Sequence, residues 1–288
     1  MPELPEVEIT RRKLLPALKS QRILDFWTDW PRGLRLANRQ ELRRDITGRS
    51  IRNVQRRGKV LFFELSGLPR RILAIHLRMS GRLEVSPSGR KFRRSTKFAS
   101  PEPARRWTHF RWRLSGGREL RFVDPRKFGL VWYGDERELR QNSYLASLGD
   151  DARDIAARRF LGALASRRGM IKPLLLRQDV FAGIGNIIAD EALWWAKIHP
   201  QQELAGLPPR DRIRLHRAVR ETIRVMLAAG GTTLRNWGHP DGRTGHYQER
   251  RLVYGKSGQP CPRCRSRLLR LFVGGRGTTI CPKCQRKK

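Results

Sequence analysis

The start of the chain carries a residue with unusual amine chemistry. The chain begins MPELPE. A small residue at position 2 normally allows the initiator methionine to be removed, and Pro2 would then present a secondary α-amine. An α-amine titrates near pH ~8, so part of it is neutral and nucleophilic at neutral pH. Its attack on a sugar C1′ gives an iminium that is cationic without a proton, and Glu3 and Glu6 could transfer protons beside it. The alternative is an ordinary helix start, because proline and acidic residues both suit a first turn.

Four cysteines near the C-terminus form the most specific motif by spacing. Cys261 and Cys264 make one CxxC pair, and Cys281 and Cys284 make a second pair after the 16 residues 265–280. Two such pairs can place four thiolates around one tetrahedral Zn²⁺ with no open position, so we expect one structural zinc ion. Its function would be to fold a segment too small for a core of its own. Redox-active CxxC pairs are the alternative.

Three shorter motifs combine polar side chains with turns. GGRG at 274–277 follows a strand pattern over 268–273, which predicts a hairpin tip where Arg276 contacts phosphate. GIGN at 183–186 precedes a helical pattern, so Asn186 is either a helix cap or a phosphate-contacting amide. RRGK at 56–59 is typical of a turn before a strand. Lys59 is a candidate functional residue only if its amine points into a cleft.

Two further turns, HLRMSG at 76–81 and DPRKFG at 124–129, each place a bulky apolar residue beside a cation. Core packing explains a single Met79 or Phe128. Together they favour a second interpretation, in which exposed apolar side chains act as a wedge in a base stack.

Composition restricts the partners. The 288 residues are 39% hydrophobic, enough for sizeable cores and two domains, and the net charge is +36. Such an excess predicts a polyanionic partner. We expect nucleic acid and no membrane, since no segment approaches the ~20 apolar residues of a spanning helix. Three acids within the first eight residues argue against a signal peptide. Paired cysteines suit a reducing cytoplasm.

Hydrophobic periodicity predicts an α+β organisation. A helix is expected over 3–19, with Val7, Leu14 and Leu18 on one face and Pro16 interrupting or ending it. Strands are expected at 59–65, 71–77, 107–114, 119–123 and 128–133, and an antiparallel sandwich or barrel fits them. In the third strand, apolar residues at 110, 112 and 114 alternate with cationic residues at 109, 111 and 113, which predicts one buried face and one cationic face in solvent. A mobile loop is expected over 87–105 and an acidic linker near 135–154. Helices are expected at 155–166, 172–181, 187–197 and 210–229.

In their order along the chain, PELPEVE, RRGK, HLRMSG, DPRKFG, AGIGN-x₂-ADEAL, VYGKSGQPCPRC and GGRGTTICPKCQ resemble the bacterial formamidopyrimidine-DNA glycosylases, within the group that includes endonuclease VIII. The resemblance spans essentially the whole chain, and the PELPE start places it on the oxidised-purine side. It implies an N-terminal antiparallel β-sandwich (1–134), a linker (135–154), a helix–two-turn–helix domain (155–242) and a C-terminal zinc ribbon (243–288).

The resemblance also implies an activity, which is a bifunctional DNA glycosylase and abasic-site lyase of base excision repair. Pro2 would attack C1′ of a flipped-out nucleotide and expel 8-oxoguanine or a formamidopyrimidine. Glu3 would protonate the opening sugar, with Glu6 as a supporting carboxylate. Lys59 would donate a proton in β-elimination, and Arg276 would assist δ-elimination. Structural zinc would be the only cofactor.

DNA contacts follow from the same resemblance. Met79, Arg126 and Phe128 match residues that fill the gap left by the extruded base and hold its orphan partner. The other positions expected to contact DNA are His109, Arg167, Lys172 and Asn186. Segment 232–245 corresponds to a loop that covers the flipped base. The partner is damaged double-stranded DNA, bound by a monomer in the bacterial cytoplasm.

Some positions depart from the family pattern. Trp107 replaces a DNA-contacting histidine, and Ile188 stands where tyrosine is usual. Residues 149–151 replace a PEP-like hinge, and the insert at 90–106 is unusually basic. Two alternatives stay open, a zinc-ribbon nucleic-acid-binding protein without chemistry and an oxidised-pyrimidine glycosylase of the same family.

Overall fold

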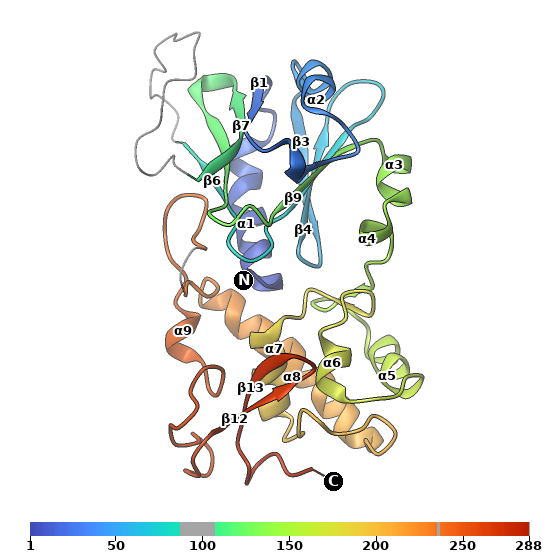
Figure 1. Ribbon diagram of the computed structural model, residues 1–288, viewed down its shortest axis with the longest axis vertical. Coiled ribbons are helices and arrows are strands. Elements are labelled where there is room, and N and C mark those ends of the chain that lie inside the picture. Colours follow the sequence, from blue (N-terminus) through green and yellow to red (C-terminus); the bar gives the residue numbers. More distant parts are fainter. Residues whose placement is uncertain (87–106, 235–236, 288) are drawn as a thin grey trace. The chain divides into compact units, whose positions relative to one another are not determined.

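The computed structural model describes residues 1–86, 107–234 and 237–287, in two compact units (Figure 1). Unit 1 comprises residues 1–2, 6–146 and 232–245, and unit 2 comprises 3–5, 147–231 and 246–288. The predicted mobile loop at 87–105 and the basic insert at 90–106 lie outside the described residues.

Unit 1 is built on two β-sheets. One sheet has the order β2-β9-β5-β4-β3 and the other β1-β7-β8-β6. The strands are β1 Ile23–Thr28, β2 Leu34–Arg35, β3 Ile51–Arg57, β4 Val60–Leu65, β5 Ile72–His76, β6 Arg82–Val85, β7 Thr108–Leu114, β8 Glu119–Val123 and β9 Leu130–Gly134. All neighbours pair antiparallel except the two-residue strand β2, which runs parallel to β9. The predicted antiparallel β-sandwich is therefore confirmed, with one short parallel edge.

Alternation along β7 creates the core of the second sheet. Phe110 and Trp112 are fully buried, as the pattern predicts. The prediction that the intervening residues form a solvent-facing cationic surface is wrong in part. Arg113 is exposed, but Arg111 pairs with buried Glu119 at 2.7 Å. His109 is also buried, and an Asp29 carboxylate oxygen lies 2.8 Å from its Nδ1.

Helix α1 (Leu4–Leu18) buries the predicted face of Val7, Leu14 and Leu18. Pro16 does not interrupt the helix, which ends two residues later. Pro16 has no N–H to donate to the carbonyl four residues earlier, so the helix lacks one hydrogen bond close to its end.

Three helices of unit 1 were not predicted from the sequence. They are α2 (Arg39–Ile46), α3 (Glu136–Gln141) and α4 (Ser143–Ala146). The last two lie in the stretch expected to be a linker. Asn38 and Asp135 each start a helix through a capping box with a glutamate three residues later. The spacing N-x-x-E or D-x-x-E in the sequence could therefore have predicted the starts of α2 and α3.

Unit 2 is mainly helical. Its helices are α5 Ala157–Ala165, α6 Ile171–Leu175, α7 Asn186–Trp195, α8 Pro209–Ala228 and α9 Tyr247–Arg250, and its strands are β10 Asp150–Asp151, β11 Phe181–Ala182, β12 Leu269–Val273 and β13 Arg276–Ile280. The helix expected at 172–181 is shorter than predicted, because the chain turns after Leu176 into the bridge between β10 and β11. Among the described residues, no helix is long and apolar enough to cross a membrane.

The core of unit 2 forms around α7, whose residues Ile188, Ala189 and Leu193 are fully buried. Helix α7 packs against α8 and against β13 of the C-terminal hairpin. Because α7 is apolar nearly all round, it is the central element that positions the polar groups described next.

Candidate active site

The first helical turn of α7 binds the carboxylate of Glu3. The N-cap residue Gly185 has no side chain to cap the helix. Glu3 supplies the cap instead: its Oε1 accepts the N–H of Ile187 at 2.8 Å, and its Oε2 accepts the N–H of Ile188 at 3.1 Å. The carboxylate is 2% exposed. A helix N-terminus is the favoured place for a negative charge, so Glu3 is held in one orientation.

The GIGN glycines make room for the N-terminal segment. A Cβ on Gly185 would lie 2.1 Å from Cδ of Glu3, and a Cβ on Gly183 would lie 2.5 Å from Leu4. Gly183 also has a positive φ of 108° and accepts the N–H of Leu4 through its carbonyl. The anion at this helix start is therefore the chain's own Glu3 carboxylate, whereas the sequence suggested a cap by Asn186 or a bound phosphate.

Glu6 begins a separate group of contacts in unit 1. Its carboxylate is buried and accepts the N–H of Thr232 at 2.8 Å. Further along α1, Lys13 pairs with Asp241 at 3.2 Å. These bonds attach segment 232–245, in which residues 235–236 are not described, to the helix that follows Pro2 at two points, Thr232 and Asp241.

The RRGK turn holds Lys59 through a buried ion pair. Arg56 donates to the carboxylate of Glu8 at 3.1 Å and to the carbonyl of Gly58 at 2.9 Å. Gly58 has a positive φ of 56°, which fits the tight turn between β3 and β4. In Figure 1 this turn and the start of α1 lie at the same end of unit 1. The side chain of Lys59 is buried, with 4% exposure.

His76 on β5 joins Lys59 in this region and was not among the predicted site residues. Burial lowers the pKa of His76 to about 3, and the charges of Arg78 and Lys59 act in the same direction. Its Nδ1 accepts the N–H of Arg78 at 2.8 Å. The imidazole is therefore neutral at neutral pH and carries its proton on Nε2, which makes it a hydrogen-bond donor. His76 could have been found from the sequence, because it is the first residue of the HLRMSG motif.

One buried carboxylate ties the two predicted wedge loops together. Asp124 accepts the hydroxyl of Ser80 from one loop and the N–H groups of Phe128 and Gly129 from the other, at 2.8 and 2.7 Å. The side chains of Met79 and Phe128 remain 45% and 44% exposed on this fixed backbone. Arg126 stacks over Phe128 at 4.4 Å.

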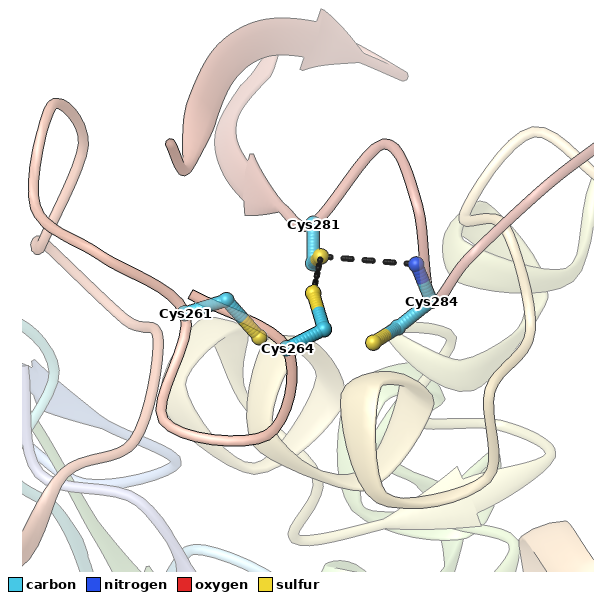
Figure 2. Close-up of side chains that lie close together, drawn as sticks. All are labelled: Cys261, Cys264, Cys281 and Cys284. Atoms are coloured by element: carbon cyan, nitrogen blue, oxygen red, sulfur yellow. Dashed lines mark hydrogen bonds between the residues drawn. The ribbon is translucent and has the colours of Figure 1, made fainter. Parts of the chain in front are cut away.

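The four cysteines lie together in unit 2. Figure 2 shows their side chains around a common space, with two cysteines from each turn. All four Sγ atoms lie within 4.8 Å of one another, and Cys264 and Cys281 are 3.3 Å apart. A Zn–S bond of about 2.3 Å requires sulfurs about 3.8 Å apart, so the group fits one tetrahedral Zn²⁺ and leaves no position for water.

The surroundings of the cysteines also fit a metal centre. Trp194 at the end of α7 donates its indole N–H to the sulfur of Cys261 at 3.4 Å. Gln285 accepts the N–H of Cys281 and donates to the carbonyl of Ile198. These bonds connect the cysteine turns to the helical core.

Comparisons with known proteins agree on one family over the whole chain. Residues 1–131 match the formamidopyrimidine-DNA glycosylase N-terminal domain, residues 148–237 match its H2TH domain, and residues 258–286 match the zinc finger found in FPG and IleRS. Formamidopyrimidine-DNA glycosylases from Pelotomaculum thermopropionicum and Chloroflexus aurantiacus are 39% and 41% identical, over 100% and 99% of this chain and 100% and 98% of theirs.

Solved structures agree as well. A Lactococcus lactis FPG mutant bound to Fapy-dG-containing DNA superposes with a TM-score of 0.87 and 32% identity, covering 99% of this chain and 100% of that one. MutM (FPG) from Thermus thermophilus has a TM-score of 0.84 and 36% identity over 100% of both chains. This chain belongs to the formamidopyrimidine-DNA glycosylase family.

Within this glycosylase, two residues expected to contact DNA are buried. Lys172 is fully buried, and its ammonium lies 2.5 Å from a carboxylate oxygen of Asp190. His109 is 3% exposed beside Asp29. Lys172 is thus paired with Asp190, and Nδ1 of His109 lies 2.8 Å from the Asp29 carboxylate. Asn186 donates to the carbonyl of Gly277 at 2.9 Å.

Other predicted residues of the glycosylase keep accessible polar groups. Arg276 is exposed at the start of β13. Arg167 is half-buried and donates to the carbonyl of Ala163 at 3.1 Å. Trp107 is 40% exposed, whereas Ile188 packs in the core of unit 2.

Proposed function

We propose that this chain is a bifunctional DNA glycosylase and abasic-site lyase that excises oxidised purines through its N-terminal proline. The observation that carries the proposal is the Pro2-Glu3 start. The residue that follows the proline nucleophile is a buried carboxylate, oriented by two N–H groups of α7. A buried charge that also serves as a helix cap is consistent with a catalytic group whose position matters.

The amine of Pro2, once Met1 has been removed, would attack C1′ and displace the damaged base. Glu3, oriented by the N–H groups of Ile187 and Ile188, carries a carboxyl group that can take up and release a proton. Glu3 would deliver a proton to the opening sugar ring oxygen. The product is an iminium between the proline nitrogen and C1′.

Strand cleavage would follow by two eliminations that need no oxidant or reductant. In the first, C2′ loses a proton and the C3′–O3′ bond breaks, which releases the 3′ strand as a phosphate. In the second, C4′ loses a proton and the C5′–O5′ bond breaks. We assign Lys59 to proton transfer in the first step and exposed Arg276 to the second. Glu6 supports the N-terminal helix.

Several residues would bind the duplex. The net charge of +36 supplies phosphate neutralisation and predicts strong salt dependence. Met79 and Phe128 would occupy the space of the extruded base, with Arg126 on the orphan partner. The neutral His76, together with Arg167 and Asn186, would donate to phosphates.

The oxidised-purine assignment rests on the PELPE start and on the Fapy-dG bound to the Lactococcus lactis relative. The same relative has also been crystallised with DNA containing an oxidised pyrimidine, so both lesion classes belong in the test. We further propose a monomer in the bacterial cytoplasm, with damaged double-stranded DNA as its partner. We also propose the domain boundaries that the sequence predicts, which follow residues 134, 154 and 242.

Borohydride trapping tests the central step. Borohydride reduces an iminium to a stable amine and so crosslinks the enzyme to DNA. The substrates are duplexes with 8-oxoguanine opposite cytosine, an oxidised pyrimidine, an abasic site or no damage. Peptide mass mapping locates the adduct. The matched control is the same protein with an uncleaved N-terminal tag, which lacks the free proline amine.

We expect base release and a crosslink at Pro2 with the 8-oxoguanine duplex, and none with the tagged protein. A crosslink with abasic DNA alone would show a lyase of different lesion preference. DNA binding without any crosslink, in protein shown by mass to begin at Pro2, would refute the enzyme and leave the binding-protein alternative.

A further inference from the structure

A buried ion pair lies beneath the C-terminal hairpin of unit 2. Lys172 on α6 is fully buried and Asp190 on α7 is 2% exposed, and their charged atoms are 2.5 Å apart. Burying two charges is costly, and an apolar pair of similar volume is often as stable. The stability of the fold alone therefore does not explain why two charged residues occupy this place.

Both members of the pair bind strand β13 next to Arg276. The ammonium of Lys172 donates to Oγ1 of Thr278 at 2.6 Å, and this hydroxyl donates to the carbonyl of Arg276 at 3.0 Å. The second carboxylate oxygen of Asp190 accepts the N–H of Thr279 at 3.0 Å. A continuous chain of hydrogen bonds thus runs from the buried charges to the backbone of the exposed arginine.

Two other contacts hold the same few residues. Asn186 donates to the carbonyl of Gly277 at 2.9 Å. At the hairpin turn, a Cβ on Gly274 would lie 3.0 Å from Pro173, the residue after Lys172. Each residue from 276 to 279 is therefore bonded directly to α6 or α7, or through one intervening hydroxyl. The Arg276 side chain projects from a backbone that cannot shift on its own.

We infer that the Lys172–Asp190 pair is a positioning element for Arg276 and determines how efficiently the second elimination follows the first. The inference rests on the proposed function, because it assigns Arg276 to that step. The two residues act through β13 and contact neither DNA nor the reacting sugar. A misplacement of about 1 Å can reduce a rate by about 100-fold, so a small displacement of the hairpin is sufficient.

The test measures two products from one abasic duplex. β-Elimination leaves an unsaturated aldehyde on the 5′ fragment, and δ-elimination leaves a 3′-phosphate. The two fragments separate on a denaturing gel. Lys172→Met leaves a buried Asp190 charge and risks unfolding, so the double variant Lys172→Met/Asp190→Asn is compared with it. In the double variant both charges are gone, and the asparagine oxygen can still accept from Thr279.

The matched control is Lys197→Met, which removes an exposed lysine of the same unit. Stoichiometric zinc and an unchanged unfolding profile identify variants that are folded. We expect the δ-to-β product ratio of the double variant to fall about tenfold or more, while that of the control is unchanged. In an Arg276→Ala background the same double substitution should produce no further fall, because the group it positions is absent.

Three outcomes would overturn the inference. They are an unaltered ratio in a folded double variant, an equal loss of both eliminations, and an undiminished effect in the Arg276→Ala background. Failure of the proposed lyase activity is distinguishable, because the unsubstituted enzyme would then not cleave the abasic duplex at all.

Discussion

Gly185→Ala is the most direct perturbation of the candidate active site. Gly185 has φ −121° and ψ −168°, which any residue can adopt, so the backbone itself does not resist the substitution. The added Cβ would lie 2.1 Å from Cδ of Glu3, well inside contact distance, so the carboxylate must move. The predicted effect is therefore steric and is directed at one side chain.

Its magnitude follows from the bonds that are lost. Glu3 accepts two N–H groups of α7, and hydrogen bonds to a charged group contribute about 1.5–3 kcal/mol each. Water can replace part of this, so we expect unfolding free energy to fall by about 3 kcal/mol, or Tm by about 6–12 °C. Base excision should fall about 100-fold, because Glu3 no longer occupies its position.

Gly162→Ala is the matched control. Gly162 lies inside α5, and no described atom lies within 4 Å of its Cβ position, so alanine there should stabilise by about 0.5–1 kcal/mol. Denaturant unfolding and single-turnover excision of 8-oxoguanine are the assays. Adding Gly185→Ala to Glu3→Ala should cause little further destabilisation. A Gly185→Ala enzyme as stable and active as the unsubstituted one would refute the reasoning.

Other predictions concern acid stability, zinc and DNA. Burial would raise the pKa of Glu8, but bonds from Arg11 and Arg12 outweigh it and lower the pKa from 4.5 to about 2. Glu8 thus stabilises the fold above pH 4.5, and about 3 kcal/mol should be lost as pH falls to about 2; denaturant unfolding of Glu8→Gln should lack this loss. Chelation of zinc should unfold the ribbon and abolish strand cleavage, and added Zn²⁺ should restore both; cleavage by fully zinc-free protein would contradict the assignment. Met79→Ala and Phe128→Ala should each weaken binding of a lesion duplex by about 1–3 kcal/mol without changing its salt slope, as measured by fluorescence titration; a changed slope would indicate phosphate contacts instead.

Local patterns were sufficient for much of this protein. The cysteine spacing predicted a zinc ribbon because four thiolates at that separation have few other uses. Alternation along β7 predicted its buried aromatic residues, and the ordered motifs indicated the family. The same reasoning missed α2 and α3, although Asn38 and Asp135 begin capping boxes, because short polar helices have little hydrophobic periodicity.

Residue types and spacing were enough to identify the reactive groups. These are a proline amine beside glutamates, a lysine in a turn, an arginine in a hairpin and four thiolates that can bind zinc. The contacts that orient these groups follow only from the tertiary structure. Glu3 caps a helix that begins more than 180 residues later, and Lys172 is buried against Asp190 and does not reach the surface. Residue type and spacing cannot reveal such contacts, because they join segments that are distant in the chain and come together only when the core of unit 2 forms.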